Sequence, residues 1–318
     1  MIVFRDPAEV PAGFGPSIIA IGKFDGVHSG HRAVIDRARV AATDAGARVV
    51  AVTFDRNPLS LLRPELCPEP VCSLEQKLEL LATAGVDATL VLRFDAQLAA
   101  LTPREFVEHV LVDALAVVRV MVGDDFRFGR GGTGDPDALT ALGAEFGFTV
   151  DVVGDVEGAG RRVSSTWVRD LLAAGDVEGA ARLLGRPHAV RGEVVHGLKR
   201  GRELGFPTAN LATDAEGFIP ADGVYAGWLV DEGAVDAASH AITRYPAAIS
   251  VGTNPTFDDV ATRQVEAYVL DETTLDLYGR NVQVQFVNRI RGMVAFEGID
   301  ALIVQMADDV ARVRAALA

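Results

Sequence analysis

The sequence predicts two domains of different class: an open, doubly wound α/β sheet, followed by an antiparallel β-barrel that ends in a helix. Three observations support this fold class. The chain has 318 residues, of which 49% are hydrophobic and 23% charged, and this suffices for two well-packed cores. Its first part alternates β-branched runs with helical stretches. Its last part consists of short extended runs bounded by Gly, Pro and Asn.

The α/β part begins with an apolar run at 17–21, a helical stretch at 31–45 and a β-branched run at 48–54. This order of strand, helix and strand builds parallel sheets. The alternation then continues through predicted helices at 74–84, 103–114 and 136–146 and predicted strands at 88–92, 117–122 and 149–153. Because the strands are almost continuously apolar, we expect helices on both faces of the sheet.

Two short helices are expected at 165–174 and 177–184, and Gly185-Arg186-Pro187 then breaks the pattern. We therefore place the domain boundary there, with one domain at 1–185 and the other at 186–318. Regular extended runs without intervening helices predict an antiparallel barrel or sandwich, of which we expect the barrel, and the runs lie at 188–195, 223–230, 247–251, 264–270 and 281–289. A final helix is expected at 299–317, where the apolar residues follow helical spacing.

The formal net charge of −14 disfavours a nucleic-acid partner, because the field of the whole molecule would repel a polyanion. A small anion such as ATP can still be held by a few local cations and backbone N–H groups. Cys67 and Cys72 are expected to be reduced, because no second pair completes a disulfide framework or a zinc site. The sequence shows no signal peptide and no membrane-spanning run, which predicts a cytoplasmic protein without a membrane partner, and it leaves self-association open.

The segment 22–31, Gly-Lys-Phe-Asp-Gly-Val-His-Ser-Gly-His, lies where the first strand passes into the first helix. Its glycines let the backbone approach a phosphate, and the helix N-terminus offers free N–H groups. His28 and His31 are three residues apart, so both rings can face one ligand. They can donate hydrogen bonds to the charge that builds on an α-phosphate as pyrophosphate leaves. The alternative is that one histidine caps the helix and the other lies on the surface.

The segment 164–169 combines hydroxyl groups at a helix start with an arginine on the first turn. Such a group can clamp the β- and γ-phosphates of ATP, although an ordinary helix cap explains it equally well. In the barrel part, Thr208 and Asn210 are two apart in extended chain and point to the same side. Their oxygens can hold a Mg²⁺ ion that also binds ATP phosphates. Without context, Thr-x-Asn is more often a turn element.

Four segments of the first part resemble, in order and spacing, the adenylyltransferase half of bacterial bifunctional riboflavin kinase/FAD synthetases. They are 22–31, Thr53-Phe54-Asp55, 123–129 and 164–169. The resemblance implies transfer of AMP from ATP to FMN. The residues it implies for catalysis are His28, His31 and Arg169, and those it implies for binding are Gly22, Phe24, Asp25, Gly30, Asp125, Ser164, Ser165 and Thr166. One departure is Arg56-Asn57-Pro58, which stands where the family usually has Pro-His-Pro.

Most of residues 187–318 resembles the riboflavin kinase half of the same family. The segments Phe-Pro-Thr-Ala-Asn at 206–210 and Gly-Thr-Asn-Pro-Thr-Phe at 252–257 are highly specific. The resemblance implies that Thr208 and Asn210 bind Mg-ATP and that Glu266 is the general base for the ribityl 5′-hydroxyl, because a primary alcohol needs a carboxylate to accept its proton. An exposed strand carboxylate is the alternative for Glu266. Further residues implied for binding are Gly197, Lys199, Arg202 and Arg291.

The expected reactions are riboflavin + ATP → FMN + ADP in the barrel and FMN + ATP → FAD + pyrophosphate in the sheet domain, both with Mg²⁺. The expected small-molecule partners are therefore ATP, riboflavin and FMN. The departure at Arg56-Asn57 keeps open a kinase whose transferase domain is impaired or altered. A flavin- or nucleotide-binding regulator without catalysis is the alternative from another class.

Overall fold

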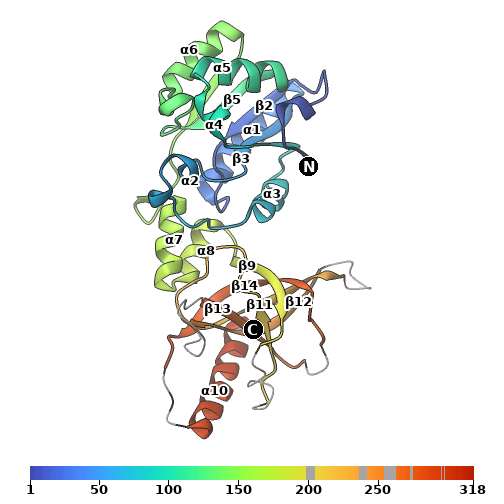
Figure 1. Cartoon of the computed structure of the whole chain (residues 1–318), viewed down its shortest axis with the longest axis vertical. Coiled ribbons are helices and arrows are strands. Elements are labelled where there is room, and N and C mark those ends of the chain that lie inside the picture. Colours follow the sequence, from blue (N-terminus) through green and yellow to red (C-terminus); the bar gives the residue numbers. More distant parts are fainter. Residues whose placement is uncertain (198–204, 236–241, 254–262, 273–274, 295, 297) are drawn as a thin grey trace. The chain divides into compact units, whose positions relative to one another are not determined.

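The chain folds into two compact units, Met1–Ser164 and Ser165–Ala318. The computed structural model describes residues 1–197, 205–235, 242–253, 263–272, 275–294, 296 and 298–318 (Figure 1). No helix within these ranges is both long and apolar enough to cross a membrane.

The first unit is built on a six-stranded parallel sheet in the order β1-β4-β3-β2-β5-β6. Its strands are β1 (Ile2–Phe4), β2 (Ser17–Ile21), β3 (Arg48–Phe54), β4 (Ala88–Leu92), β5 (Val117–Gly123) and β6 (Thr149–Val153). The strand order reverses beside β2. The carboxyl ends of β2 and β5 therefore form the switch point at which open α/β sheets bind their ligands.

Alternate residues of β2 enter two cores on opposite faces of the sheet. Ile18 and Ala20 pack in the core that also holds residues of α1 (Ser29–Ala45) and α3 (Leu74–Thr83). Ile19 and Ile21 pack in the other core, which includes residues of α5 (Pro103–Phe106), η3 (Val107–Ala114) and α6 (Pro136–Phe146). The prediction of a doubly wound sheet is confirmed.

Several elements differ from the expectation. The helix expected at 103–114 consists of the short α5 and the π-helical η3. The sequence prediction also lacked the edge strand β1 and the elements α2 (Leu59–Leu62), α4 (Ala96–Ala100), β7 (Glu157–Gly158) and β8 (Arg161–Arg162). All of these are too short to show a clear periodicity in the sequence.

The second unit contains a closed antiparallel barrel, which confirms the predicted architecture. Its strand order is β10-β13-β12-β11-β14-β9. Its strands are β9 (His188–Val195), β10 (Thr208–Leu211), β11 (Gly223–Val235), β12 (Ile242–Thr253), β13 (Arg263–Val269) and β14 (Asn281–Arg291). The terminal helix α10 (Ile299–Leu317) packs on β11, β12 and β14 (Figure 1). Its Val313 is buried in a cluster with Ala226 and Leu270.

The helices α7 (Ser165–Ala174) and α8 (Val177–Leu184) belong to the same compact unit as the barrel. They pack on each other, and α8 packs on β14 and β9. Glu178 of α8 also accepts a hydrogen bond from the side chain of Asn288. The chain thus passes from the first compact unit to the second after Ser164. The sequence pattern changes from alternating strands and helices to short extended runs only at residue 185. The domain boundary expected there stays a prediction.

Candidate active sites

The loop 22–31 follows β2 directly, at the switch point of the sheet. His28 is the N-cap of α1, and its Nδ1 accepts a hydrogen bond from the backbone N–H of His31 at 3.4 Å. The two imidazole rings stack with centroids 3.7 Å apart, and the ring of Phe24 meets His31 edge-on at 5.3 Å. A side chain at Gly30 would lie 3.1 Å from the His28 ring, so the close packing of this ring favours glycine there. His28 therefore caps α1 and also stacks on His31, so the two roles suggested for the histidines are combined in one arrangement.

The environment of His31 favours its neutral form. Burial lowers the pKa of His31 well below its usual 6.5, and electrostatic interaction with the nearby basic groups of His28, Lys23, Lys77 and Arg162 lowers it further. Its Nδ1 is buried and has no hydrogen-bond partner among the described residues. A neutral imidazole donates one N–H, so His31 can offer a hydrogen bond to an anion without being protonated.

The remaining predicted residues of the loop have clear structural partners. Gly22 donates its N–H to the carbonyl of Val52, which keeps the end of β2 beside β3. Asp25 accepts a hydrogen bond from the N–H of Val71 at 2.8 Å. Phe24 is buried in the core beneath α1. These contacts fix the loop, and whether the same residues also touch a substrate stays a prediction.

Asp125 lies just past the carboxyl end of β5, the other strand of the switch point. Arg162 of β8 bonds its carboxylate at 2.9 Å and that of Asp155 at 2.8 Å. Because Arg162 also lowers the pKa of His31, the histidine pair shares an electrostatic environment with the end of β5. The structure thus brings together the motifs at 22–31 and 123–129.

The segment 164–169 is divided between the two compact units. Ser164 is the last residue of the first unit, and Ser165 begins α7 in the second. Within α7, Arg169 donates from Nη2 to the hydroxyl of Thr166 at 3.3 Å. The phosphate-binding role of these residues stays a prediction.

The departure at Arg56-Asn57 has a structural explanation. Asn57 accepts a hydrogen bond from the N–H of Leu59 through Oδ1 at 3.0 Å, and this supports the turn into α2. Arg56 pairs with Asp55 at 3.3 Å on an exposed surface. Asp55 in turn accepts a hydrogen bond from the N–H of Phe94 at 2.8 Å. Arg56 and Asn57 therefore both contribute to local structure at the end of β3.

In the barrel, the predicted kinase residues converge. Glu266 of β13 lies opposite Asn210 of β10 in the strand register. The hydroxyl of Thr208 donates to Oε2 of Glu266 at 3.3 Å and accepts from Nδ2 of Asn210 at 3.2 Å. Burial raises the pKa of Glu266, and the hydrogen bond from Thr208 opposes that rise. Glu266 is therefore a partly desolvated carboxylate and not an exposed strand residue.

A pocket lies beside this group. Its lining includes the polar side chains of Thr208, Asn210 and Glu272, together with Gly197 and Ala209. The remaining lining residues are largely apolar: Val194, Pro207, Val269, Leu275, Leu277 and Tyr278. A side chain at Gly197 would lie 2.6 Å from the side-chain amide of Asn210, so this close approach favours glycine. The ring of Tyr278 packs against that of His196 with centroids 3.9 Å apart. The pocket combines polar oxygens with an apolar wall, as small-molecule sites commonly do.

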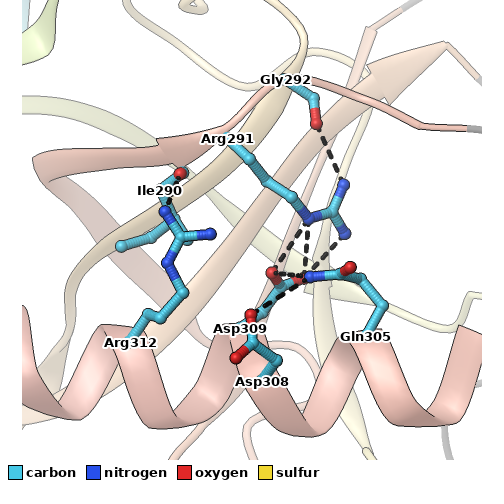
Figure 2. Close-up of polar contacts among 7 residues, drawn as sticks. All are labelled: Ile290, Arg291, Gly292, Gln305, Asp308, Asp309 and Arg312. Atoms are coloured by element: carbon cyan, nitrogen blue, oxygen red, sulfur yellow. Dashed lines mark hydrogen bonds and ion pairs between the residues drawn. The ribbon is translucent and has the colours of Figure 1, made fainter.

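Arg291 of β14 is engaged by the terminal helix. Its Nε and Nη2 bond the carboxylate of Asp309 of α10 at 2.9 and 2.7 Å (Figure 2). Its role in binding a substrate stays a prediction. Lys199 and Arg202, which were also predicted to bind, lie outside the described residues.

Sequence reasoning missed two residues beside the histidine pair, Lys77 and Cys72. Cys72 was interpreted only as a reduced thiol, but its Sγ accepts a hydrogen bond from the N–H of Gly26 at 3.3 Å. Lys77 is buried among the ends of β2 and β3. One sequence signal could have identified it, because Lys77 lies on the same helical stripe as the apolar Leu74 and Leu81.

Comparison with known proteins covers both units. The family model described as FAD synthetase matches residues 12–167, and the one described as riboflavin kinase matches residues 184–317. The bifunctional riboflavin kinase/FMN adenylyltransferase of Escherichia coli K12 is 38% identical over 92% of this chain and 90% of that protein. The protein of the same description from Pseudomonas fluorescens is 40% identical over 94% of this chain and 92% of that protein.

One solved structure agrees over nearly the whole length of the chain. It is described as a macrolide-efflux protein from Streptococcus pneumoniae, with a TM-score of 0.86, 31% identity and 98% of both chains covered. Both enzyme domains predicted from the sequence are thus present in one chain, in the predicted order. The chain therefore belongs to the family of bifunctional riboflavin kinases/FMN adenylyltransferases.

Proposed function

We propose that the barrel phosphorylates riboflavin with ATP to give FMN, and that the parallel-sheet unit transfers AMP from a second ATP to FMN to give FAD and pyrophosphate. Membership of the family supports both reactions. The observation that carries the proposal is the convergence of Thr208, Asn210 and Glu266 beside one pocket. These are the groups that transfer of a phosphoryl group to an alcohol requires.

In the kinase reaction, Glu266 accepts the proton of the riboflavin 5′-hydroxyl. The hydroxyl oxygen then forms a bond to the γ-phosphorus of ATP, and the bond between that phosphorus and ADP breaks. The raised pKa of Glu266 makes its carboxylate a stronger base than an exposed glutamate. Its partner Thr208 holds the carboxylate in place through the hydrogen bond at 3.3 Å.

The oxygens of Thr208 and Asn210 suit Mg²⁺, which prefers oxygen ligands. Within the described ranges, no three His, Cys, Asp or Glu side chains cluster as a metal site. Thr208 and Asn210 would hold a Mg²⁺ that is bound together with a nucleotide. When bound, the ion neutralises charge on the phosphates.

In the transferase reaction, a phosphate oxygen of FMN forms a bond to the α-phosphorus of ATP, and the bond to pyrophosphate breaks. Because Nδ1 of His28 accepts the N–H of His31, the neutral His28 ring carries its proton on Nε2. Neutral His31 offers one further N–H. Both rings then stabilise the charge on the α-phosphate, together with the N-terminus of α1.

The substrates in this proposal are ATP, riboflavin and FMN, and the protein acts in the cytoplasm. The cytoplasmic location is supported by Cys67 and Cys72, which are not disulfide-bonded. Free thiols are usual in reducing compartments.

The direct test is a product assay with purified full-length protein, riboflavin and Mg-ATP, followed by chromatography of the flavins. We expect FMN first and FAD later, and neither when EDTA removes the metal. Absence of any flavin nucleotide would overturn the proposal. Formation of FMN without FAD would restrict it to the kinase.

A further inference from the structure

Lys77 of α3 has a buried ammonium group for which the proposed mechanism has no use. The residue is only 9% exposed. Its Nζ donates to the carbonyl of Phe54 at 2.9 Å, to the carbonyl of Lys23 at 3.3 Å and to the hydroxyl of Thr53 at 3.3 Å. An ammonium has three N–H donors, so these three acceptors satisfy it fully.

The three acceptors belong to two adjacent strand ends. Lys23 follows β2 and opens the loop that carries His28 and His31, whereas Thr53 and Phe54 end β3. Thr53 also donates its own hydroxyl hydrogen to the carbonyl of Lys23 at 3.2 Å. A single side chain from α3 thus joins two of the motifs by which the sequence resembles the transferase family.

The loop has a conformation that needs such support. Phe24 and Val27 adopt left-handed backbone angles, with φ of 50° and 42°. Non-glycine residues rarely do so, and β-branched ones least of all, unless the surrounding contacts hold them there. The segment just before Lys77 supplies two further contacts, from Val71 to Asp25 and from Gly26 to Cys72.

We propose that Lys77 is a positioning residue of the transferase site, which holds the loop 22–31 so that His28 and His31 keep their stacked arrangement, and which adds a fixed positive charge beside them. This inference rests on the proposed adenylyl transfer. It assigns Lys77 no contact with the reacting atoms.

The charges around His31 make this role measurable. The groups that lower the pKa of His31 are His28 and Lys23 on its own loop, Lys77 on α3 and Arg162 on β8. Burial lowers the pKa of Lys77, while Cys72, Asp25 and Asp55 act to raise it, and its three acceptors favour the charged form. Removing the charge of Lys77 should therefore let His31 become protonated at a higher pH.

The experiment compares Lys77→Met, which removes charge and donors, with Lys77→Arg, which keeps both. Glu75→Gln is the control, since it changes one charge at an exposed position of the same helix. FAD formation from supplied FMN is measured from pH 5 to 9. FMN formation from riboflavin in the same preparation reports the concentration of folded barrel.

We expect Lys77→Met to reduce kcat for FAD formation on the order of 100-fold, because small displacements of catalytic groups have effects of this size. FMN formation should be unchanged. In Lys77→Met, the rate of FAD formation should begin to fall at a higher pH on the acid side of its pH profile. Lys77→Arg should restore part of the rate and the wild-type pH profile. Glu75→Gln should match the wild type.

Two results would overturn the inference. The first is a Lys77→Met protein that forms FAD within about threefold of the wild-type rate. The second is a Lys77→Met protein whose remaining FAD-forming rate falls at the same acid pH as that of the wild type, together with a Lys77→Arg protein that is no more active than Lys77→Met. The second result would mean that Lys77 only stabilises the unit. A wild-type protein that forms no FAD would refute the proposed function instead. Amide exchange of residues 23–27 would then test the role of Lys77 alone, since faster exchange in Lys77→Met supports it and unchanged exchange refutes it.

Discussion

Asp309 of α10 forms a bidentate ion pair with the guanidinium of Arg291 from β14 (Figure 2). The side chain of Arg291 is only 16% exposed and that of Asp309 only 6%. Gln305, one turn earlier on α10, donates to the same carboxylate at 3.0 Å. Because both charges are largely removed from water, each depends on the other for compensation.

Replacement of Asp309 should therefore destabilise the second unit. We expect Asp309→Asn to lower its free energy of unfolding by about 3 kcal/mol, because the buried guanidinium loses its partner. The neighbouring exposed Asp308→Asn is the matched control and should change stability by less than about 0.5 kcal/mol. Both tryptophans, Trp167 and Trp228, lie in the second unit, so urea unfolding followed by tryptophan fluorescence of the full chain reports on this unit. Equal midpoints for the two variants would contradict this account.

The stability of the second unit should fall in mild acid because of His188. Burial lowers the pKa of His188 to about 4, and its ring donates to the carbonyl of Phe218. Between pH 6.5 and about 4 the unfolded chain binds a proton at this residue and the folded chain does not. The free energy of unfolding should thus decrease by about 1.4 kcal/mol per pH unit as the pH falls through this window, and roughly 3 kcal/mol in all.

The measurement is the pH dependence of urea unfolding, again by tryptophan fluorescence. His188→Gln should flatten the slope by about one proton between pH 6.5 and 4, whatever its effect on absolute stability. His196→Gln, at an exposed position of the same unit, is the control and should keep the wild-type slope. If the free energy of unfolding of His188→Gln kept the wild-type dependence on pH, His188 would not be the source of that dependence.

Glu266→Gln should separate the two reactions. Loss of the base should reduce FMN formation by about 10²- to 10⁴-fold, while FAD formation from supplied FMN continues at the wild-type rate. Because only the carboxylate is active and burial raises the pKa of Glu266, the kinase rate of the wild type should increase with pH through a value above 4.5. Glu193→Gln, an exposed carboxylate on β9, is the control. Simultaneous loss of both activities would argue against two independent sites.

Substitution of the histidine pair should have the converse effect. His28→Asn keeps a side chain that can cap α1, and His31→Gln keeps a hydrogen-bond donor. We expect the double variant to lose FAD formation by at least about 10²-fold, because the α-phosphate loses both imidazole donors, and to form FMN normally. Chromatography of products from riboflavin and from FMN distinguishes these outcomes. Undiminished FAD formation would remove the histidines from the mechanism.

The local patterns of the sequence determined most elements of both units. The β-branched runs at 17–21 and 48–54 are strands with these same bounds, and the helix at 299–317 is α10. The succession of strand and helix placed the histidines at the start of the first helix, and their three-residue spacing indicated that both rings can face one ligand. The extended Thr-x-Asn pair indicated that its two side chains lie together. Periodicity and short spacing are properties of neighbouring residues, so they can be read without the fold.

Tertiary structure alone decided how distant segments complete the sites. The hydrogen bonds of Lys77 to Lys23 and Phe54 join residues far apart in the chain, and no local pattern specifies such a partner. The ion pair of Arg291 with Asp309 and the packing of α7 and α8 with the barrel unit are of the same kind. Burial also changes the acidity of His31 and Glu266, because only the fold determines which groups lose contact with water.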